Sequence, residues 1–111
     1  MTKAPDTRMV LSRIAKERER QDKMWGTQRR YPFGFGLPGS ERLLDEAREN
    51  YESAAGMENL CWSHVLTEEV AELFAAKSLE EIELEAIQVA AVACLIAERA
   101  AAERAPIKGV A

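Results

Sequence analysis

Apolar residues recur every three or four positions through most of the chain, which is the spacing of one face of an α-helix. The first such segment begins at Asp6 or Thr7, either of which can cap a helix, and runs to about residue 22. Val10 and Ile14 lie on its apolar side. Its second half, KERERQDK, is almost wholly charged. That composition is typical of a solvated helix face with opposite charges paired one turn apart.

Three more segments follow the same helical spacing. Ser40 can cap a helix over about 41–55, and a third helix is predicted over about 58–77. Ser78 can cap a fourth, because Glu81 stands three residues later in the arrangement of a capping box. Strand patterns are nearly absent. The predicted fold class is therefore all-α, a bundle of about four helices.

Glycines and prolines interrupt the helical pattern over 24–39, and four of the chain's seven aromatic residues lie there. No Gly-Lys-Ser/Thr follows, so the segment is not a phosphate-binding P-loop. The favoured interpretation is a hydrophobic lid over the bundle or a contact between subunits. The length predicts one domain over 1–111, with this loop in its middle and a tail at 106–111.

Charge, hydropathy and cysteine usage exclude several classes of protein. The net charge of −4 argues against a nucleic-acid partner, which needs a basic surface. No apolar run approaches the roughly 20 residues of a membrane span, and the first ten residues lack the apolar core of a secretory signal. Cys61 and Cys94 fall in helical patterns and form no disulfide framework. We expect a cytoplasmic protein with no membrane partner.

The small size of the chain also bears on its assembly. A domain of 111 residues buries only a modest fraction of its surface when it folds alone. The alanine-rich stretch over 86–105 lets another helix approach closely. We therefore expect homo-oligomerisation to complete the bundle.

Carboxylates border or interrupt the apolar faces of the third and fourth helices. In the third, Glu68, Glu69 and Glu72 occupy the sector beside an apolar stripe formed by Trp62, Leu66, Val70 and Leu73. In the fourth, Glu85 stands in the middle of the apolar face, with Gln88 at its edge; that face is formed by Ile82, Val89, Val92 and Ile96. An ionised carboxylate in such a place is costly unless it is paired or binds a metal.

Two arrangements would satisfy these acids. A basic residue from a neighbouring helix can pair with Glu85, or several acids can converge on a divalent cation. Oxygen ligands alone suit Mg²⁺ or Mn²⁺. A helical di-iron site would need Glu-x-x-His motifs, and the single histidine, His64, is in no such position. Spacing alone leaves the ion pair and the cation site both open.

The order and spacing of these acids resemble a known family. Glu69-Val-Ala-Glu72 is followed by twelve residues and then by Glu85-Ala-Ile-Gln88. This resembles the E-x-x-E and E-x-x-D elements of the MazG-like all-α nucleoside triphosphate pyrophosphohydrolases. The flanking stretches WSHVLTEEVAELFAA and LEAIQVAAVA, together with the upstream ERERQDKMWG, resemble a compact phage and actinobacterial branch of that superfamily. The middle loop and second helix match least.

The resemblance implies Mg²⁺-dependent hydrolysis of a nucleoside or deoxynucleoside triphosphate to the monophosphate and pyrophosphate, with Mn²⁺ as a substitute ion. Metal ligands would be Glu69, Glu72, Glu85 and Gln88. Glu68, beside Glu69, would orient the attacking water or hold an additional ion. Gln88 stands where the family pattern has Asp, and its carbonyl can bind a cation without adding charge.

The resemblance also implies partners, and roles for residues other than the acids and Gln88 named above. Trp25 would stack on a base, and Arg29 and Lys77 would meet phosphates. The family commonly forms homodimers or homotetramers, and it serves in nucleotide-pool control. In a phage relative, hydrolysis of dGTP is one such setting, in the host cytoplasm. The competing hypothesis is a non-catalytic helical module that binds nucleotides or a protein, and a third is a purely structural bundle.

Overall fold

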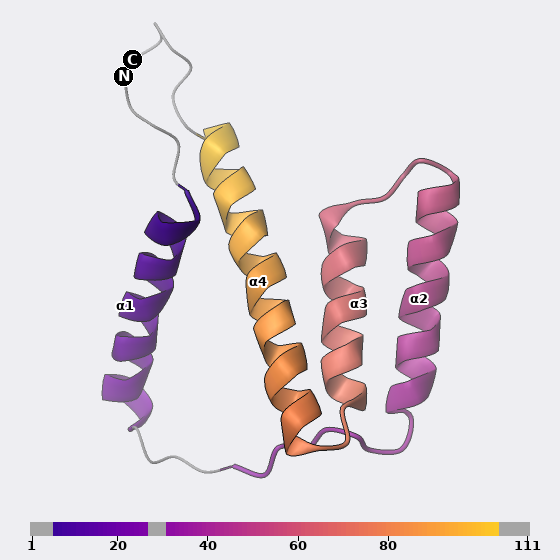
Figure 1. Ribbon diagram of the computed structural model, residues 1–111, viewed down its shortest axis with the longest axis horizontal. Helices are drawn as coiled ribbons and strands as arrows, with labels where there is room; N and C mark the ends of the chain where they lie inside the picture. The colour runs from indigo at the N-terminus through magenta and orange to yellow at the C-terminus, as the bar shows by residue number, and fades with distance from the viewer. Residues whose placement is uncertain (1–5, 27–30, 105–111) are drawn as a thin grey trace, which may run out of the picture. The chain divides into compact units, whose positions relative to one another are not determined.

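The computed structural model describes residues 6–26 and 31–104 (Figure 1). Within those ranges the chain forms four helices and no strand, which confirms the all-α prediction. The helices are α1 (Thr7–Trp25), α2 (Ser40–Gly56), α3 (Trp62–Ala75) and α4 (Leu79–Arg104). None of the described helices is long and apolar enough to cross a membrane.

Helix α1 begins at the predicted cap and ends later than predicted. The Asp6 side chain accepts a hydrogen bond from the Met9 backbone N–H at 3.0 Å, so Asp6 is the N-cap. The helix continues to Trp25, and Gly26 ends it with φ 85°, a conformation that suits glycine. Its charged half has the expected pairing, for example between Arg18 and Asp22 at 3.0 Å.

The start of α2 differs from the prediction. Ser40 is the first helical residue, and Gly39 is the N-cap without any side-chain cap hydrogen bond. The turn before the helix brings the Ser40 N–H to the Leu37 carbonyl at 3.1 Å and puts Gly39 at φ 95°. Glycine adopts that left-handed conformation readily, whereas serine in its place would be strained. The prediction of Ser40 as the cap was therefore wrong.

Helix α3 starts at Trp62, four residues later than predicted. Helix α2 ends at Gly56, and the chain then turns through Glu58, whose φ of 57° is not helical. Helix α3 therefore cannot include the predicted first residues. Cys61 is the N-cap of α3, and its backbone N–H donates to Nδ1 of His64 at 2.9 Å. His64 therefore has a structural role in holding the first turn of α3.

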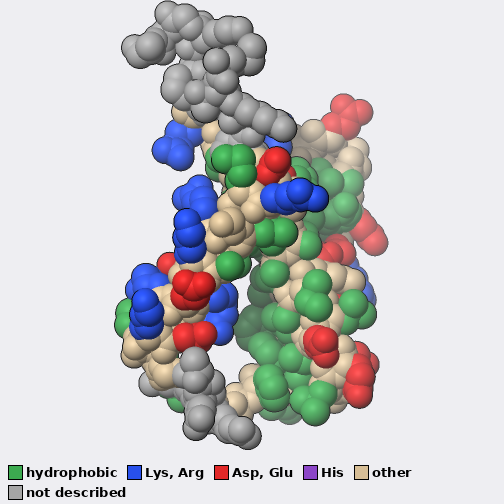
Figure 2. All heavy atoms as spheres, turned by 60° about the vertical axis from the view of Figure 1, so that its left-hand side comes forward, with side chains coloured by type: hydrophobic (Ala, Val, Ile, Leu, Met, Phe, Trp, Pro, Cys, Tyr) green, Lys and Arg blue, Asp and Glu red, His purple; other side chains and the backbone are tan. Residues whose placement is uncertain are grey.

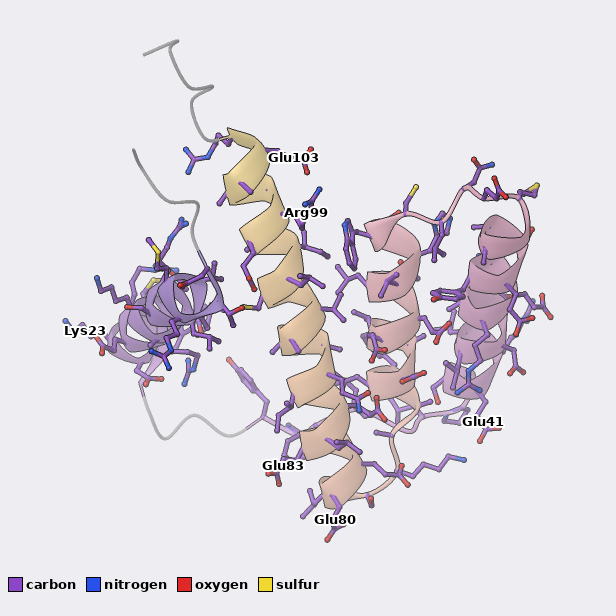
Figure 3. The ribbon with its side chains drawn as sticks, turned by 45° about the horizontal axis from the view of Figure 1, so that its top comes forward. Lys23, Glu41, Glu80, Glu83, Arg99 and Glu103 are labelled. Carbon is purple, nitrogen blue, oxygen red and sulfur yellow. The ribbon has the colours of Figure 1, made fainter. Side chains whose placement is uncertain are left out.

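Helix α4 begins where the capping pattern placed it. The Ser78 hydroxyl accepts from the Glu81 backbone N–H at 3.1 Å, which confirms the predicted cap. The reciprocal bond falls one residue earlier than in a capping box, since the Glu81 carboxylate accepts from the Lys77 N–H at 2.9 Å. Further along the helix, Glu83 points away from α3 (Figure 3). The predicted tail at 106–111 lies outside the described residues.

The chain divides into two compact units. The unit formed by 33–93 contains α2, α3 and the first half of α4, and in it α2 packs along α3 (Figure 1). Its buried side chains among the described residues are small: Ser40, Ala47, Ala54, Ala71 and Ala76. Small side chains let helices approach closely, but they bury little apolar area.

The other unit combines α1 with the second half of α4. There the Thr7 hydroxyl donates to the Glu98 carboxylate at 2.8 Å, and Val10 is buried. Cys94 is also buried, as a free thiol. The single-domain assignment over 1–111 stays a prediction.

Large apolar side chains remain exposed on both units. On α4, Leu84 is 53% exposed and Ile87 is 59% exposed. On α3, Trp62 and Phe74 are each close to half exposed. Figure 2 shows hydrophobic side chains open to solvent over much of the face in view. No large side chain among the described residues is completely buried.

Candidate metal centre

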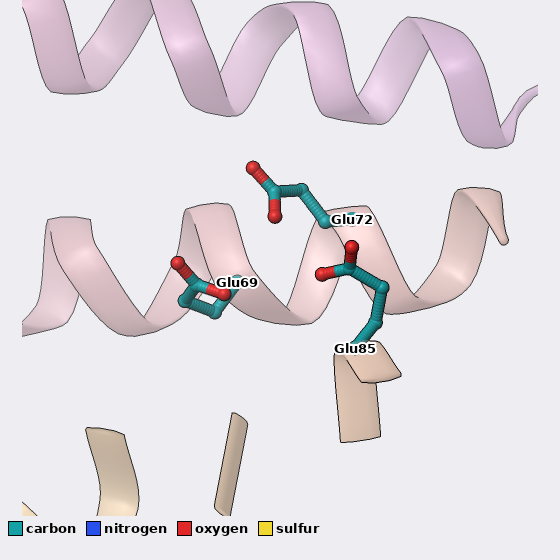
Figure 4. A group of neighbouring side chains, drawn as sticks. All are labelled: Glu69, Glu72 and Glu85. Carbon is teal, nitrogen blue, oxygen red and sulfur yellow. The ribbon is translucent and has the colours of Figure 1, made fainter. Parts of the chain in front are cut away.

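Three carboxylates from two helices meet at one point in the 33–93 unit (Figure 4). Glu69 and Glu72 come from α3, and Glu85 comes from α4. One carboxylate oxygen from each lies within 4.8 Å of the others, and all three side chains are half-buried. Convergence of the acids, one of the two arrangements that the helical spacing left open, is therefore present for these three residues.

The sequence produces this convergence by simple helix geometry. Residues three apart project from the same side of a helix, so Glu69 and Glu72 lie one turn apart on α3. On α4 the half-buried residues include Ile82, Glu85 and Val89, which share one face. That face carries Glu85 to α3 together with its apolar neighbours.

The charges at this point are only partly balanced. Partial burial raises the pKa of Glu69, and the negative charges of Glu72 and Glu68 raise it further. Partial burial also raises the pKa of Glu72, and a hydrogen bond with Glu85 and the charge of Glu85 add to this effect. Arg48 lowers the pKa of Glu72 but does not reverse the rise.

Arg48 is the cation that the structure brings to the cluster. Its Nη2 lies 3.8 Å from Oε1 of Glu72, at the limit of an ion pair, and its side chain is about half exposed. Such an exposed contact contributes at most about 1 kcal/mol. This contact involves Glu72 and not Glu85, so among the described residues the pairing of Glu85 with a basic residue, which the spacing left open, is not observed.

Gln88 lies against the same carboxylates. With its amide nitrogen turned toward them, it donates to Oε2 of Glu69 at 3.2 Å and to Oε2 of Glu85 at 3.3 Å. The opposite orientation would set the amide oxygen against carboxylate oxygens, which is repulsive when they are ionised. The same side chain can therefore bridge two acids as a donor, or turn its carbonyl toward a cation.

The donor set fits a hard divalent cation. Mg²⁺ binds oxygen at about 2.1 Å in an octahedron, so its ligand oxygens lie about 3 to 4 Å apart. The three carboxylate oxygens lie within 4.8 Å of each other, so small side-chain rotations would close the site. Three half-buried carboxylates with little positive charge beside them could therefore hold a divalent ion.

The other predicted site residues are not part of this cluster. Glu68 is half-buried next to Glu69, but its carboxylate is not among the three that converge. Lys77 follows α3 and forms an ion pair with Glu41. Trp25 ends α1 and is 49% exposed, in the other unit. Arg29 lies outside the described residues. The roles predicted for these residues remain predictions.

Sequence reasoning missed Arg48. It belongs to α2, a segment that carries acids and bases around most of its surface and resembles the family least. The small residues Ala47 and Ala54 could have indicated which side of α2 packs on α3, and both are buried. Arg48 lies at the edge of that side.

The chain was also compared with known proteins. No family model matches it, and neither does any curated protein or solved structure.

Proposed function

We propose that the protein is a Mg²⁺-dependent nucleoside triphosphate pyrophosphohydrolase of the MazG-like kind. The observation that carries the proposal is the meeting of Glu69, Glu72 and Glu85 from two helices at one half-buried point. The resemblance of the two acidic elements, in their order and twelve-residue separation, supports the same activity. The products are a nucleoside monophosphate and pyrophosphate.

The cluster by itself would repel a triphosphate. Glu69, Glu72 and Glu85 would hold the cation, and Gln88 can link two of these acids through its amide. A bound divalent cation supplies positive charge to the phosphates and to the charge that develops in the transition state. The ligands must be deprotonated to bind it, so their raised pKa values make binding weaker in acid.

Glu68 is the candidate for positioning the attacking water. It lies next to Glu69 in sequence, and its negative charge contributes to the raised pKa of that residue. A carboxylate near the metal ligands can accept a proton from water as it attacks phosphorus. Arg48 acts as a positioning residue, because its contact with Glu72 holds one ligand in place.

We propose further that the active form is a homodimer or homotetramer. Leu84 and Ile87 on α4 are more than half exposed, whereas the buried side chains of the 33–93 unit are mostly alanines. A second copy would remove apolar surface from water at about 25 cal/mol for each Å². Base recognition is a separate matter: it would come from residues outside the acid cluster, with Trp25 as the candidate.

A nucleotide panel tests the activity directly. Eight common ribo- and deoxynucleoside triphosphates, with dGTP included, are incubated with Mg²⁺, with Mn²⁺ and with EDTA, and the products are identified. We expect pyrophosphate and a monophosphate from at least one of them, and neither product in EDTA. Release of inorganic phosphate with a diphosphate would contradict the proposed cleavage site.

Variants separate the metal centre from other acids on the same helix. Glu85→Gln keeps the size of the side chain but removes a charged ligand, so we expect activity to fall at least about 100-fold. Glu83→Gln is the matched control, because Glu83 is exposed and points away from α3 (Figure 3). It should retain activity within about twofold. If no triphosphate is cleaved with either ion, the non-catalytic binding module becomes the better explanation.

A further inference from the structure

A recess lies at the start of α2, apart from the residues that form the acid cluster. It has a volume of about 270 Å³ and is lined by residues 36–41 and by Lys77. All of its lining belongs to the 33–93 unit. Pockets that hold whole drug-sized ligands are usually about 300 to 1,000 Å³, so this one suits a single small group.

The loop before α2 is fixed against the end of α3. Phe35 packs edge to face on Phe74 with the ring centres 5.5 Å apart. The Gly36 N–H donates to the Phe74 carbonyl at 2.7 Å. Gly36 has φ 69°, and a Cβ on it would come within 2.8 Å of the Ala76 carbonyl oxygen. The wall of the recess is therefore held in one position by packing and a backbone hydrogen bond.

The first turn of α2 begins at this recess, whose lining includes Ser40 and Glu41. Its N-cap, Gly39, offers no side chain to accept from the backbone N–H groups of this turn. The Ser40 N–H is satisfied by Leu37, and the Leu43 N–H by Gly39. The amides of Glu41 and Arg42 lie between these two, where a helix has no carbonyl to receive them. The helix dipole adds partial positive charge at the same end.

Ser40 provides a second and independent observation. The residue is 7% exposed and lines the recess. Within residues 6–26 and 31–104 its hydroxyl has no hydrogen-bond partner, and no buried side-chain oxygen in those ranges lacks one. The Ser40 oxygen therefore keeps some exposed surface although the residue is buried. A hydroxyl in this position can donate to a ligand that accepts a hydrogen bond.

Lys77 and Glu41 provide the charges at the recess. Nζ of Lys77 pairs with the Glu41 carboxylate, and both side chains are otherwise exposed. The Glu41 carboxylate thus lies at the N-terminal end of α2, where the helix dipole is positive, and it also pairs with the Lys77 ammonium. Glu81 is engaged nearby through the Lys77 backbone N–H. An incoming anion would therefore compete with Glu41 for Lys77.

We propose that this recess binds a phosphoryl group, with Ser40, Lys77 and the amides of Glu41 and Arg42 as its donors. Glu41 acts as the internal anion that the phosphoryl group displaces from Lys77. A tetrahedral oxyanion accepts hydrogen bonds from several directions, as the hydroxyl, ammonium and amide donors require. The inference does not depend on the proposed hydrolysis or on a metal ion. The phosphoryl group belongs either to free phosphate or pyrophosphate, or to the tail of a nucleotide.

The test is a titration of the full chain, labelled with ¹⁵N, in EDTA at constant ionic strength. Phosphate, pyrophosphate and a nucleoside triphosphate are added in separate arms, with chloride as the reference. We expect saturable shifts of the Glu41 and Arg42 amide signals. Equal shifts in all arms assign the site to any phosphoryl group, and shifts with the triphosphate alone assign it to a nucleotide tail. No saturable shift in any arm would overturn the proposal.

Variants decide whether the binding is specific. Lys77→Gln should weaken it about tenfold, and Ser40→Ala about fivefold, through one lost hydrogen bond each. Glu41→Gln should tighten it several-fold, because the competing carboxylate is gone. Arg99→Gln is the control, since it removes the same unit of charge from an exposed side chain that pairs with Glu103 and lies outside the 33–93 unit. Equal weakening in Lys77→Gln and Arg99→Gln, or weakening in Glu41→Gln, would show non-specific attraction and reject the site.

Because these titrations contain no divalent ion, they separate this inference from the proposed function. If no phosphate compound binds in the titrations but the nucleotide panel shows hydrolysis, only the proposed phosphoryl site is rejected. Binding without any hydrolysis in the nucleotide panel would reject the pyrophosphohydrolase alone.

Discussion

At the scale of single residues, partial burial and mutual repulsion raise the proton affinity of the carboxylates in the acid cluster formed by Glu69, Glu72 and Glu85. Glu69 and Glu72 have raised pKa values because they are partly buried and lie near other carboxylates. Arg48 offsets this only in part for Glu72. A carboxyl whose pKa is higher in the folded than in the unfolded chain binds more protons when folded. Folding is then favoured by acid over the range between the two pKa values.

This linkage predicts how stability depends on pH in the absence of metal. In EDTA, the melting temperature should fall as pH rises from the ordinary glutamate pKa, about 4.3, through the raised values. Glu72→Gln should flatten that fall and raise the melting temperature at pH 7.5, because one repelling charge is gone. Mg²⁺ should raise the melting temperature of the wild type and have a smaller effect on the variant.

Scanning calorimetry from about pH 4 to pH 8, with EDTA and with Mg²⁺, measures both effects across the window that begins at the ordinary glutamate pKa. Glu83→Gln is the control, since Glu83 is an exposed acid on α4 outside the cluster. A wild type whose stability in EDTA rises steadily with pH would contradict the shared-charge account of Glu69 and Glu72.

At the scale of elements, helical periodicity foretold what depends on one helix at a time. It placed Glu69 and Glu72 on one side of α3 and Glu85 on the buried face of α4, and these acids do meet. The Ser78 cap of α4 was equally local and was confirmed. The side of each helix on which the acids lie was therefore accessible from spacing, whereas spacing alone did not decide between an ion pair and a cation site.

Backbone turns and contacts between elements could not be read in the same way. The chain has a left-handed backbone at Gly39 before α2 and at Glu58 before α3, and hydrophobic periodicity does not report such turns. Arg48 reaches Glu72 only because α2 packs along α3. Alternation of polar and apolar residues carries no information about which helix lies beside which.

The loop before α2 gives a prediction at this scale. Gly36 and Gly34 have nearly equal backbone angles, φ 69° and φ 72°. A Cβ at 36 would strike the Ala76 carbonyl, whereas at 34 it would meet nothing within 4 Å. Both changes to alanine impose the same backbone strain, of about 1 kcal/mol. Gly36→Ala should therefore destabilise the protein by about 1 to 3 kcal/mol more than Gly34→Ala does.

Urea unfolding of the two variants measures that difference in the free energy of unfolding. The backbone strain of alanine is common to both variants, so only the contact with the Ala76 carbonyl distinguishes them. Equal midpoints would mean that the loop is not held against the end of α3 as described. The same comparison reports on the recess beside α2, since its wall contains Gly36.

At the scale of the whole molecule, charge and apolar surface are distributed unevenly. The first 30 residues contain nine basic and four acidic side chains, and the remaining 81 contain six basic and fifteen acidic ones. Two copies can place these opposite regions against each other, and the attraction would weaken as salt rises. Exposed leucine and isoleucine on α4 give a larger contribution, about 1.5 to 3 kcal/mol for each side chain that becomes buried.

Self-association is therefore the last prediction, and light scattering after size exclusion measures it. We expect a mass of two or four times the 12.4 kDa chain. Replacing both Leu84 and Ile87 by glutamate should shift the mass toward a single chain at equal concentration, because four charges or more would be buried in the assembly. Leu84→Met with Ile87→Met keeps apolar bulk and should leave the mass unchanged. A wild type that elutes as one chain at every concentration would contradict self-association, and hydrolysis by such a monomer would show that one copy carries the complete site.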